Sequence, residues 1–318
     1  MLGIPRNGLS TSDANYILGS RDGYIWIGGY SGIIRYDGST FERLDTSDGL
    51  TSGRGLFEDS QGRIWVATND NGVVVLDGEE RIHYTYKDGL TSSSIRTFAE
   101  DTEGGVYVGT TAGVCYVNAE MELSVIDDAR LNEERVLRLV SDSQGRIYGQ
   151  TKSGIVFLIE DHKVSEVYES SELGMETIAS ILIDPVHQGK VYIATKSNVL
   201  YYGEFGDDAA HMQHISIDPL KSVQWISYDC GRVWITSTTT AGYLDENQRF
   251  HVLDDIPMTS AIEMMTSDYQ GNMWFASSTE GVMKVITNHF VDLTKQAGLP
   301  EMVSNAVCFH DDMLYIGT

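Results

Sequence analysis

The chain has 318 residues, of which 42% are hydrophobic and 21% are charged, so it can bury a substantial core and is not expected to be disordered. Its 46 acidic and 22 basic residues give a formal net charge of −24. A surface that negative repels phosphate backbones and anionic headgroups, which argues against nucleic acid as a partner. No stretch approaches the ~18 apolar residues of a membrane span, so no membrane insertion is expected. The N-terminal MLGIPRNGL also lacks the basic and apolar regions of a signal peptide.

From the N-terminus onward, one short pattern recurs: a polar turn, glycine, an apolar residue, an aromatic, a second apolar residue and small residues. Examples are SRDGYIWIGG, DSQGRIWVAT, DTEGGVYVGT and DYQGNMWFAS. The central aromatics of the copies are Trp26, Trp65, Tyr107, Tyr148, Tyr192, Trp234, Trp274 and Tyr315. They are separated by 39, 42, 41, 44, 42, 40 and 41 residues. This regular spacing predicts a repeat architecture.

The second copy illustrates the elements expected in each repeat. GRGLFED (53–59) is followed by a turn, RIWVAT (63–68), a turn at Asn71 and Gly72, VVVLD (73–77) and RIHYTY (81–86). Each copy therefore predicts four short strands bounded by turn residues. The segment NEERVLRLV (132–140) could be helical taken alone, but its place in the repeat predicts an inner strand.

Four antiparallel strands at this period predict an all-β fold, a seven-bladed β-propeller. Seven complete copies assign residues 1–293 to the propeller, and 294–318 to the first two strands of an eighth repeat. The eighth repeat either opens a second propeller or helps to close the first. The repeated aromatics of the seven copies, Trp26 to Trp274, are expected to pack between blades as structural residues. Cys115 and Cys308 lie in apolar strand-like runs and are expected to be buried.

A second pattern links the blades. It comprises Asn7-Gly8-Leu9-Ser10, Asp48-Gly49-Leu50-Thr51, Asp88-Gly89-Leu90-Thr91 and Ala297-Gly298-Leu299. With the D-x-x-G-x-I-W-[IV]-[GA]-T strand, the chain resembles the two-component regulator propeller repeat, strongly in the first three copies and weakly in the fourth to sixth. The resemblance implies an extracytoplasmic sensor region of a membrane-anchored bacterial protein with a histidine kinase or diguanylate cyclase output. It also implies that further domains of the same protein are partners, and that the input is a small molecule or, as for many members of the family, a carbohydrate.

No catalytic, metal or cofactor motif is recognised in the sequence. His211 and His214 could chelate a metal but have no third ligand nearby in sequence, so no metal site is predicted. The acids Asp59, Asp101, Asp142, Asp184 and Asp268 recur at one turn in successive copies. We therefore expect them to fix turns through bonds to backbone amides and not to act as catalysts.

A ligand is expected at the mouth of the central channel, where loops enter the innermost strands. Five residues before the turn position stand Asn15, Arg54, Arg96, Leu137, Ala179, Gln224 and Glu263, and a shift of one residue adds Tyr16, Arg138 and Trp225. These polar and aromatic side chains suit a sugar or a small anion. The predicted ligand-binding residues are Asn15, Tyr16, Arg54, Arg96, Arg138, Gln224, Trp225 and Glu263. The alternative is that they simply line a water-filled channel.

Three functions stay open at this point. The first is a propeller that senses a small molecule or carbohydrate by binding it and does not act as an enzyme. The second is a scaffold for protein interaction or homodimerisation, and the third is a glycan hydrolase or lyase. A polar, aromatic-lined cavity would favour the first, a flat apolar patch the second, and a close pair of carboxyl groups the third.

Overall fold

The computed structural model describes residues 2–3, 9, 11–253, 256, 258–286, 306–310 and 313–317. The chain divides into two compact units, Met1–Val285 and Ile286–Thr318. The first unit contains seven four-stranded antiparallel sheets, and the second contains a two-stranded sheet. The prediction of an all-β, seven-bladed propeller is therefore confirmed.

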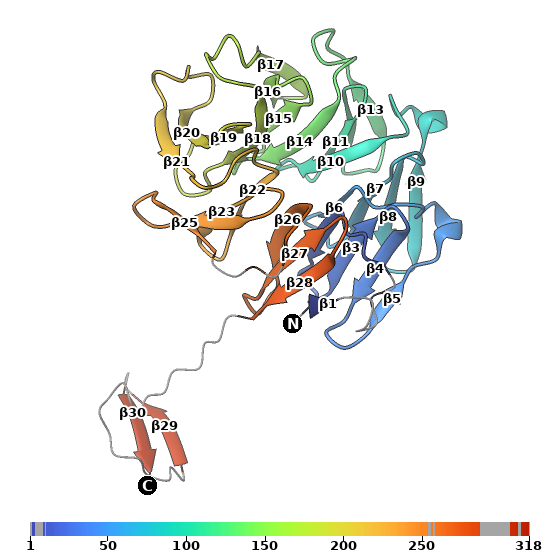
Figure 1. Cartoon of the computed structure of the whole chain (residues 1–318). Helices are drawn as coiled ribbons and strands as arrows, with labels where there is room; N and C mark the ends of the chain where they lie inside the picture. The colour runs from blue at the N-terminus through green and yellow to red at the C-terminus, as the bar shows by residue number, and fades with distance from the viewer. Residues whose placement is uncertain are drawn as a thin grey trace. The chain divides into compact units, whose positions relative to one another are not determined.

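The seven sheets follow one another around a ring in chain order, from the blue first blade to the orange seventh (Figure 1). The first strand of each blade is the innermost. These strands are β2 (Tyr16–Gly19), β6 (Gly55–Glu58), β10 (Ile95–Glu100), β14 (Val136–Ser141), β18 (Ile178–Ile183), β22 (Trp225–Asp229) and β26 (Ile262–Ser267). Each contacts the innermost strand of the next blade, and β26 contacts β2, so the ring is closed. The segment 132–140 contributes β14, as its place in the repeat predicts.

Each chain segment then runs outward through its blade. The second strands are β3 (Ile25–Gly29), β7 (Ile64–Ala67), β11 (Val106–Thr110), β15 (Ile147–Thr151), β19 (Lys190–Thr195), β23 (Arg232–Thr236) and β27 (Met273–Ser277). The third strands are β4 (Gly32–Tyr36), β8 (Val73–Asp77), β12 (Val114–Val117), β16 (Val156–Glu160), β20 (Val199–Glu204), β24 (Ala241–Leu244) and β28 (Gly281–Val285). The outermost strands of blades 1 to 6 are β5 (Phe41–Arg43), β9 (Glu80–Tyr84), β13 (Leu123–Ile126), β17 (Lys163–Tyr168), β21 (Gln213–Ser216) and β25 (Phe250–Val252).

The seventh blade takes its outermost strand from the start of the chain. Strand β1 (Leu2–Gly3) pairs antiparallel with β28, with Leu2 opposite Met283 and Gly3 opposite Val282. The sequence pattern instead counts the seventh copy as complete by residue 293, and residues 287–305 lie outside the described part of the chain. The borrowed strand covers an edge of blade 7 and joins the two ends of the ring.

The hydrophobic core is divided among the spaces between blades. Seven clusters of buried residues occur in the described structure, and each draws its members from two neighbouring blades. The repeated aromatics Trp26, Trp65, Tyr107, Tyr148, Tyr192, Trp234 and Trp274 are all buried, each in the cluster between its own blade and the next. Cys115 is also buried there. Burial between sheets explains why a bulky ring recurs once per repeat.

One short motif explains why an acid and an aromatic recur together. In blade 2, Asp59 Oδ1 accepts hydrogen bonds from the backbone N–H groups of Gln61 and Arg63, at 3.0 and 2.9 Å. Its Oδ2 accepts the indole N–H of Trp65 at 2.8 Å, so one carboxylate fixes the turn and orients the ring. Equivalent bonds to backbone N–H groups form at Asp101, Asp142, Asp184 and Asp268. The prediction that these acids fix turns is confirmed.

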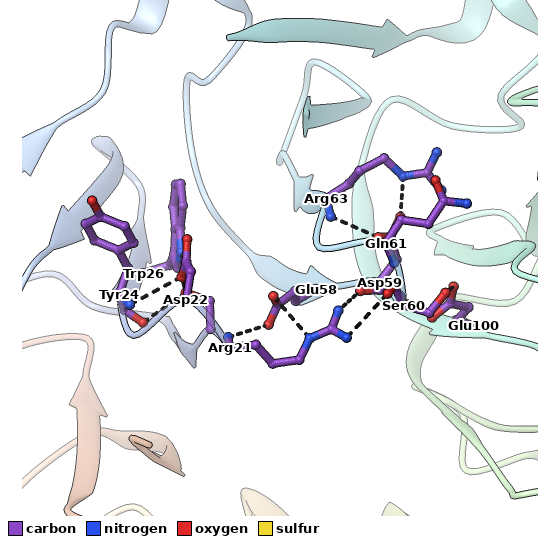
Figure 2. A network of polar contacts seen from close by, with 11 residues as sticks. Arg21, Asp22, Tyr24, Trp26, Glu58, Asp59, Ser60, Gln61, Arg63 and Glu100 are labelled. Carbon is purple, nitrogen blue, oxygen red and sulfur yellow. Dashed lines mark hydrogen bonds and ion pairs between the residues drawn. The ribbon is translucent and has the colours of Figure 1, made fainter. Parts of the chain in front are cut away.

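The same turns also connect blade 1 to blade 2 and blade 2 to blade 3. In Figure 2, the backbone N–H of Arg21 in blade 1 donates to Glu58 of blade 2 at 2.8 Å, and its guanidinium pairs with that carboxylate at 3.2 Å. The N–H and hydroxyl of Ser60 likewise donate to Glu100 of blade 3, at 2.7 and 2.6 Å. Glu58 ends β6, whereas Arg54 precedes it. These contacts therefore hold the end of the blades opposite the predicted ligand residues.

The Gly-Leu links have a structural reason as well. The 3-10 helices η2 (Thr46–Asp48) and η3 (Tyr86–Asp88) end at Gly49, with φ of 88°, and Gly89, with φ of 110°. Side chains other than glycine rarely adopt these angles. The following residues, Leu50 and Leu90, are buried in the clusters on either side of blade 2. Each link thus turns the chain sharply and anchors it in the core.

The second unit contains strands β29 (Ala306–His310) and β30 (Met313–Gly317), paired antiparallel. Cys308 is exposed in this sheet, so the expectation of a buried thiol is wrong there. A sheet of two strands has no second layer of its own that could cover both faces.

Candidate functional site

The predicted ligand residues lie where the chain enters the innermost strands. In four blades, this position is a β-bulge: the pairing shifts around Arg96, Leu137, Ala179 and Glu263. In the other three blades, Asn15, Arg54 and Gln224 stand just before the strand, and their N–H groups bond the neighbouring strand at 2.8 Å. A bulge re-aims a side chain relative to the regular pleat. The bulges and strand starts therefore form a ring of variable side chains at one end of the channel.

A cavity of about 150 Å³ lies at this mouth. It is lined by Asn15, Tyr16, Arg54, Arg96, Leu137, Gln224, Trp225, Glu263 and Met264. The structure thus brings together seven of the eight predicted ligand residues, which come from blades 1, 2, 3, 6 and 7. The eighth, Arg138, lies in an adjoining cavity. That a ligand binds to these residues stays a prediction.

The adjoining cavity is larger, about 480 Å³, and opens between blades 4, 5 and 6. It shares Leu137, Gln224 and Trp225 with the smaller cavity. It is lined in addition by Arg138, Gln150, Lys152, Thr177, Ile178, Ala179, Ser180, Lys196, Ser222 and Val223. Ala179 occupies the bulge of blade 5, and the equivalent positions of blades 2 and 3 hold Arg54 and Arg96. The small side chain leaves the space that this cavity fills.

Arg138 crosses the channel. It starts from β14 in blade 4, and its Nη2 donates to the carbonyl of Ile226 in blade 6 at 2.6 Å. Its guanidinium carbon lies 3.7 Å from the centre of the Trp225 ring, a close cation–π contact. The residue is only 7% exposed, and burial lowers its pKa to about 10 despite the attraction of Tyr16 and Asp229. It stays protonated at neutral pH.

The aromatic rings of Trp225 and Tyr16 lie next to each other and line the smaller cavity. The two rings meet edge to face at 5.6 Å between centroids, with an interplanar angle of 85°. Burial raises the pKa of the Tyr16 hydroxyl, which stays neutral in the physiological range. Blades 1, 4 and 6 therefore supply a tyrosine, an arginine and a tryptophan that together narrow the channel.

The other mouth residues are held by neighbouring side chains. Arg54 donates from Nη1 to the Tyr30 hydroxyl at 2.5 Å, and Arg96 donates to Asn69 at 3.2 Å. Burial, followed by the charges of Arg54 and Arg135, lowers the pKa of Arg96 to about 10. Three guanidinium groups therefore lie near one another on blades 2 to 4.

Asn15 and Glu263 also have partners on their own blades. Asn15 donates to Asp13 at 2.6 Å, and Glu263 accepts the Ser278 hydroxyl at 2.7 Å. These bonds limit the rotamers of both side chains, so the polar groups on this side of the mouth are already positioned.

Several lining residues escaped the sequence analysis, notably Gln150, Lys152, Ser180 and Lys196. Lys152 and Lys196 each follow the repeated aromatic of their blade by four residues. The equivalent positions in other blades include Tyr30 and Asn69, the partners of Arg54 and Arg96. A comparison across the blades of the position four residues after the repeated aromatic would have identified Lys152 and Lys196.

No metal centre is found among the described residues: no group of three potential ligands comes together there. His211 bonds Asp208 at 2.7 Å, and His214 bonds the Ala209 carbonyl at 2.6 Å, so both rings have structural partners in their loop. Within the described ranges, no helix has the length and apolar composition of a membrane span.

The fold and its mouth define a seven-bladed β-propeller with a polar, aromatic-lined cavity at one end of its channel. Residues 52–70 match the family model described as the two component regulator propeller, and this segment contains the turn at Asp59 and the ring of Trp65. One repeat of this family is thus recognised, in the second blade. Among curated proteins, none matches its sequence significantly.

Solved structures with this fold include sensors and enzymes. The extracellular domain of BT3049, described as a hybrid two component system of B. thetaiotaomicron, is 21% identical with a TM-score of 0.71, over 94% of this chain and 42% of that one. The corresponding domain of BT4673 from the same organism is 16% identical with a TM-score of 0.68, over 89% and 39%. The chain therefore spans about two fifths of these extracellular domains.

An inactive histidine-to-alanine variant of virginiamycin B lyase from Staphylococcus aureus, solved with quinupristin, is 13% identical with a TM-score of 0.73, over 88% and 98% of the two chains. All three identities are low, and they establish a shared fold.

Proposed function

We propose that this chain is a ligand-sensing input region of a bacterial signalling protein, placed outside the cytoplasm and binding a small molecule or glycan at the channel mouth. The observation that carries the proposal is the pair of adjoining cavities that share Gln224 and Trp225, the larger of which is also lined by Arg138. Ligand sites typically combine a concave shape with a few convergent polar groups and aromatic rings. The repeat family, and the extracellular sensor domains that share the fold, support the signalling context.

Binding is a better interpretation of the mouth than catalysis. Glycan hydrolysis by paired carboxyl groups needs two of them about 5 to 10 Å apart. Of the described residues that line the two cavities, Glu263 alone carries a carboxylate. The lyases with this fold show that propellers can support chemistry, but the residues at this mouth supply neither a second acid nor a histidine.

A scaffold role has less support. The large apolar residues that are exposed, such as Tyr30, Tyr86, Val186 and Tyr269, come from different blades. A protein interface would instead be expected to gather such residues into one patch.

A thermal-shift screen tests the proposal. The protein is heated with monosaccharides, oligosaccharides, amino acids or small anions, because a ligand that binds the folded state alone raises the thermal midpoint. A concentration-dependent rise for one chemical class is expected. Silence across all four classes would contradict a small-molecule role for this chain.

A further inference from the structure

The charge of the larger cavity is opposite to that of the whole chain. Acidic residues outnumber basic ones by 46 to 22 in the sequence. The described residues that line this cavity nevertheless include Arg138, Lys152 and Lys196 and no acid. In a chain of net charge −24, such a cavity attracts anions that the remaining surface repels.

The charge of Arg138 is only partly compensated by the protein, through the attraction of Asp229. Within the described residues, no carboxylate forms an ion pair with it, and its Nε and Nη1 are shielded from solvent without a hydrogen-bond partner. A buried charge left unpaired is costly, and the contact with the Trp225 ring offsets only part of that cost. A bound anion would compensate it.

The side chains of Lys152 and Lys196 add further positive charge to the larger cavity. Both are exposed, and in the described part of the chain neither ammonium group pairs with an acid. They stand next to the small Ala179, on blades 4 and 5. In blades 1 and 2 the equivalent positions hold Tyr30 and Asn69, which bond an arginine of the next blade. Here the two lysines border open space instead.

The remaining lining suits a molecule that bears hydroxyl groups. Gln150 is 1% exposed, and its Oε1 acceptor has no partner in the described structure. Ser180, Thr177 and Ser222 contribute hydroxyls, and Trp225 contributes a ring. The volume of about 480 Å³ falls within the range of about 300–1,000 Å³ typical of small-molecule sites.

We infer that the larger cavity binds an acidic saccharide, a sugar-sized molecule whose anionic group is held by Arg138, Lys152 and Lys196. The inference rests on the proposed ligand-sensing function and names the ligand class of that site. It needs two tests, one for the positive field and one for the ligand.

Fluorescence quenching of Trp225 tests the positive electrostatic field of the larger cavity in the absence of a ligand. Trp225 is the one partly exposed tryptophan, because Trp26, Trp65, Trp234 and Trp274 are buried. Iodide should therefore quench Trp225 efficiently, and neutral acrylamide provides the reference. We expect the double variant Lys152→Gln/Lys196→Gln to lower the iodide quenching constant about twofold at fixed ionic strength, with acrylamide quenching unchanged.

The matched control is Lys87→Gln/Lys163→Gln, which removes the same charge from exposed positions on the outer part of blades 2 and 4. If this control and the Lys152→Gln/Lys196→Gln variant lower the iodide quenching constant equally, the quenching reflects net charge. The inferred positive field at the larger cavity is then overturned.

Titration with D-glucuronate and D-galacturonate, against D-glucose and D-galactose, tests the ligand class. The uronates should bind more tightly than the neutral sugars. The Lys152→Gln/Lys196→Gln variant should bind the uronates about tenfold more weakly than the wild type, roughly what the loss of two partly screened charges implies. Equal binding of neutral sugars, unchanged in the variant, would overturn the acidic class and leave the proposed function standing. Sulfate binding as tight as the uronates would overturn the saccharide part. If no compound of the wider screen binds, the proposed function itself fails.

Discussion

Replacing Trp65 with alanine should destabilise the propeller more than most single substitutions. The ring is fully buried in the cluster between blades 2 and 3, stacked on Tyr84 at 6.5 Å and tilted against Phe98 at 5.9 Å. Truncation of a buried tryptophan costs about 3–5 kcal/mol. It also removes one donor from buried Asp59, which adds about 1 kcal/mol because the carboxylate keeps its other three hydrogen bonds. We therefore expect a loss of roughly 4–6 kcal/mol in the free energy of unfolding.

Urea denaturation of the wild type and two further variants separates the contributions. Trp65→Phe keeps a ring but loses the indole N–H, so its cost should stay near 1–2 kcal/mol, about that of the hydrogen bond and a small cavity. Tyr86→Ala removes an aromatic that is 65% exposed and should change stability by less than about 0.5 kcal/mol. If Trp65→Ala cost no more than Trp65→Phe, the packing explanation for the repeated aromatic would be refuted.

Three further outcomes follow from the structure. Arg54 and Arg96 line the smaller cavity, which shares Gln224 and Trp225 with the larger one, so Arg54→Ala and Arg96→Ala should each weaken binding of the ligand found in the screen and leave the thermal midpoint nearly unchanged; binding unaffected by both would contradict the assignment of the smaller cavity to the ligand site. Burial raises the pKa of Asp229, opposed by hydrogen bonds from serine side chains, so the folded state holds this proton more tightly than the unfolded state and stability falls as the pH rises above about 4. Asp229→Asn should therefore raise the thermal midpoint at pH 7, and the gain should disappear near pH 4; a gain independent of pH would argue against burial as the cause. Gly49→Ala, at a φ of 88° with a new Cβ only 2.9 Å from His83, should lower stability by about 1–2 kcal/mol in the same denaturation assay.

The repeat made much of the fold predictable. Each blade needs the same turn acid and the same buried ring, so a period of 39 to 44 residues identifies the blades and the order of their strands. The mouth was predictable for the same reason: positions such as Asn15, Arg54 and Gln224 vary while the neighbouring apolar positions are kept. Repetition thus separates the residues that build the scaffold from the residues that differ for another reason.

Contacts between residues that are far apart in the sequence cannot be predicted from the repeat pattern. Arg138 contacts Ile226, 88 residues away, across the channel, and this contact depends on the ring diameter. Lys152 and Lys196 line the larger cavity from positions directly after the second strands of blades 4 and 5, and these positions were not compared across the blades. Strand β1 has two residues, too few to show any alternation.

The pairing of β1 with β28 constrains the order in which this chain can fold. Leu2 meets Met283, so the ring cannot be sealed during synthesis until its seventh blade has left the ribosome. Blades 1 to 6 can form their own sheets earlier, because each is built from contiguous sequence. The N-terminal strand meanwhile has to stay unpaired, with its backbone available to other chains. Closure of the ring is therefore expected to be a late and vulnerable step in folding, even though the loop-closure entropy grows only slowly with the length of chain that is closed.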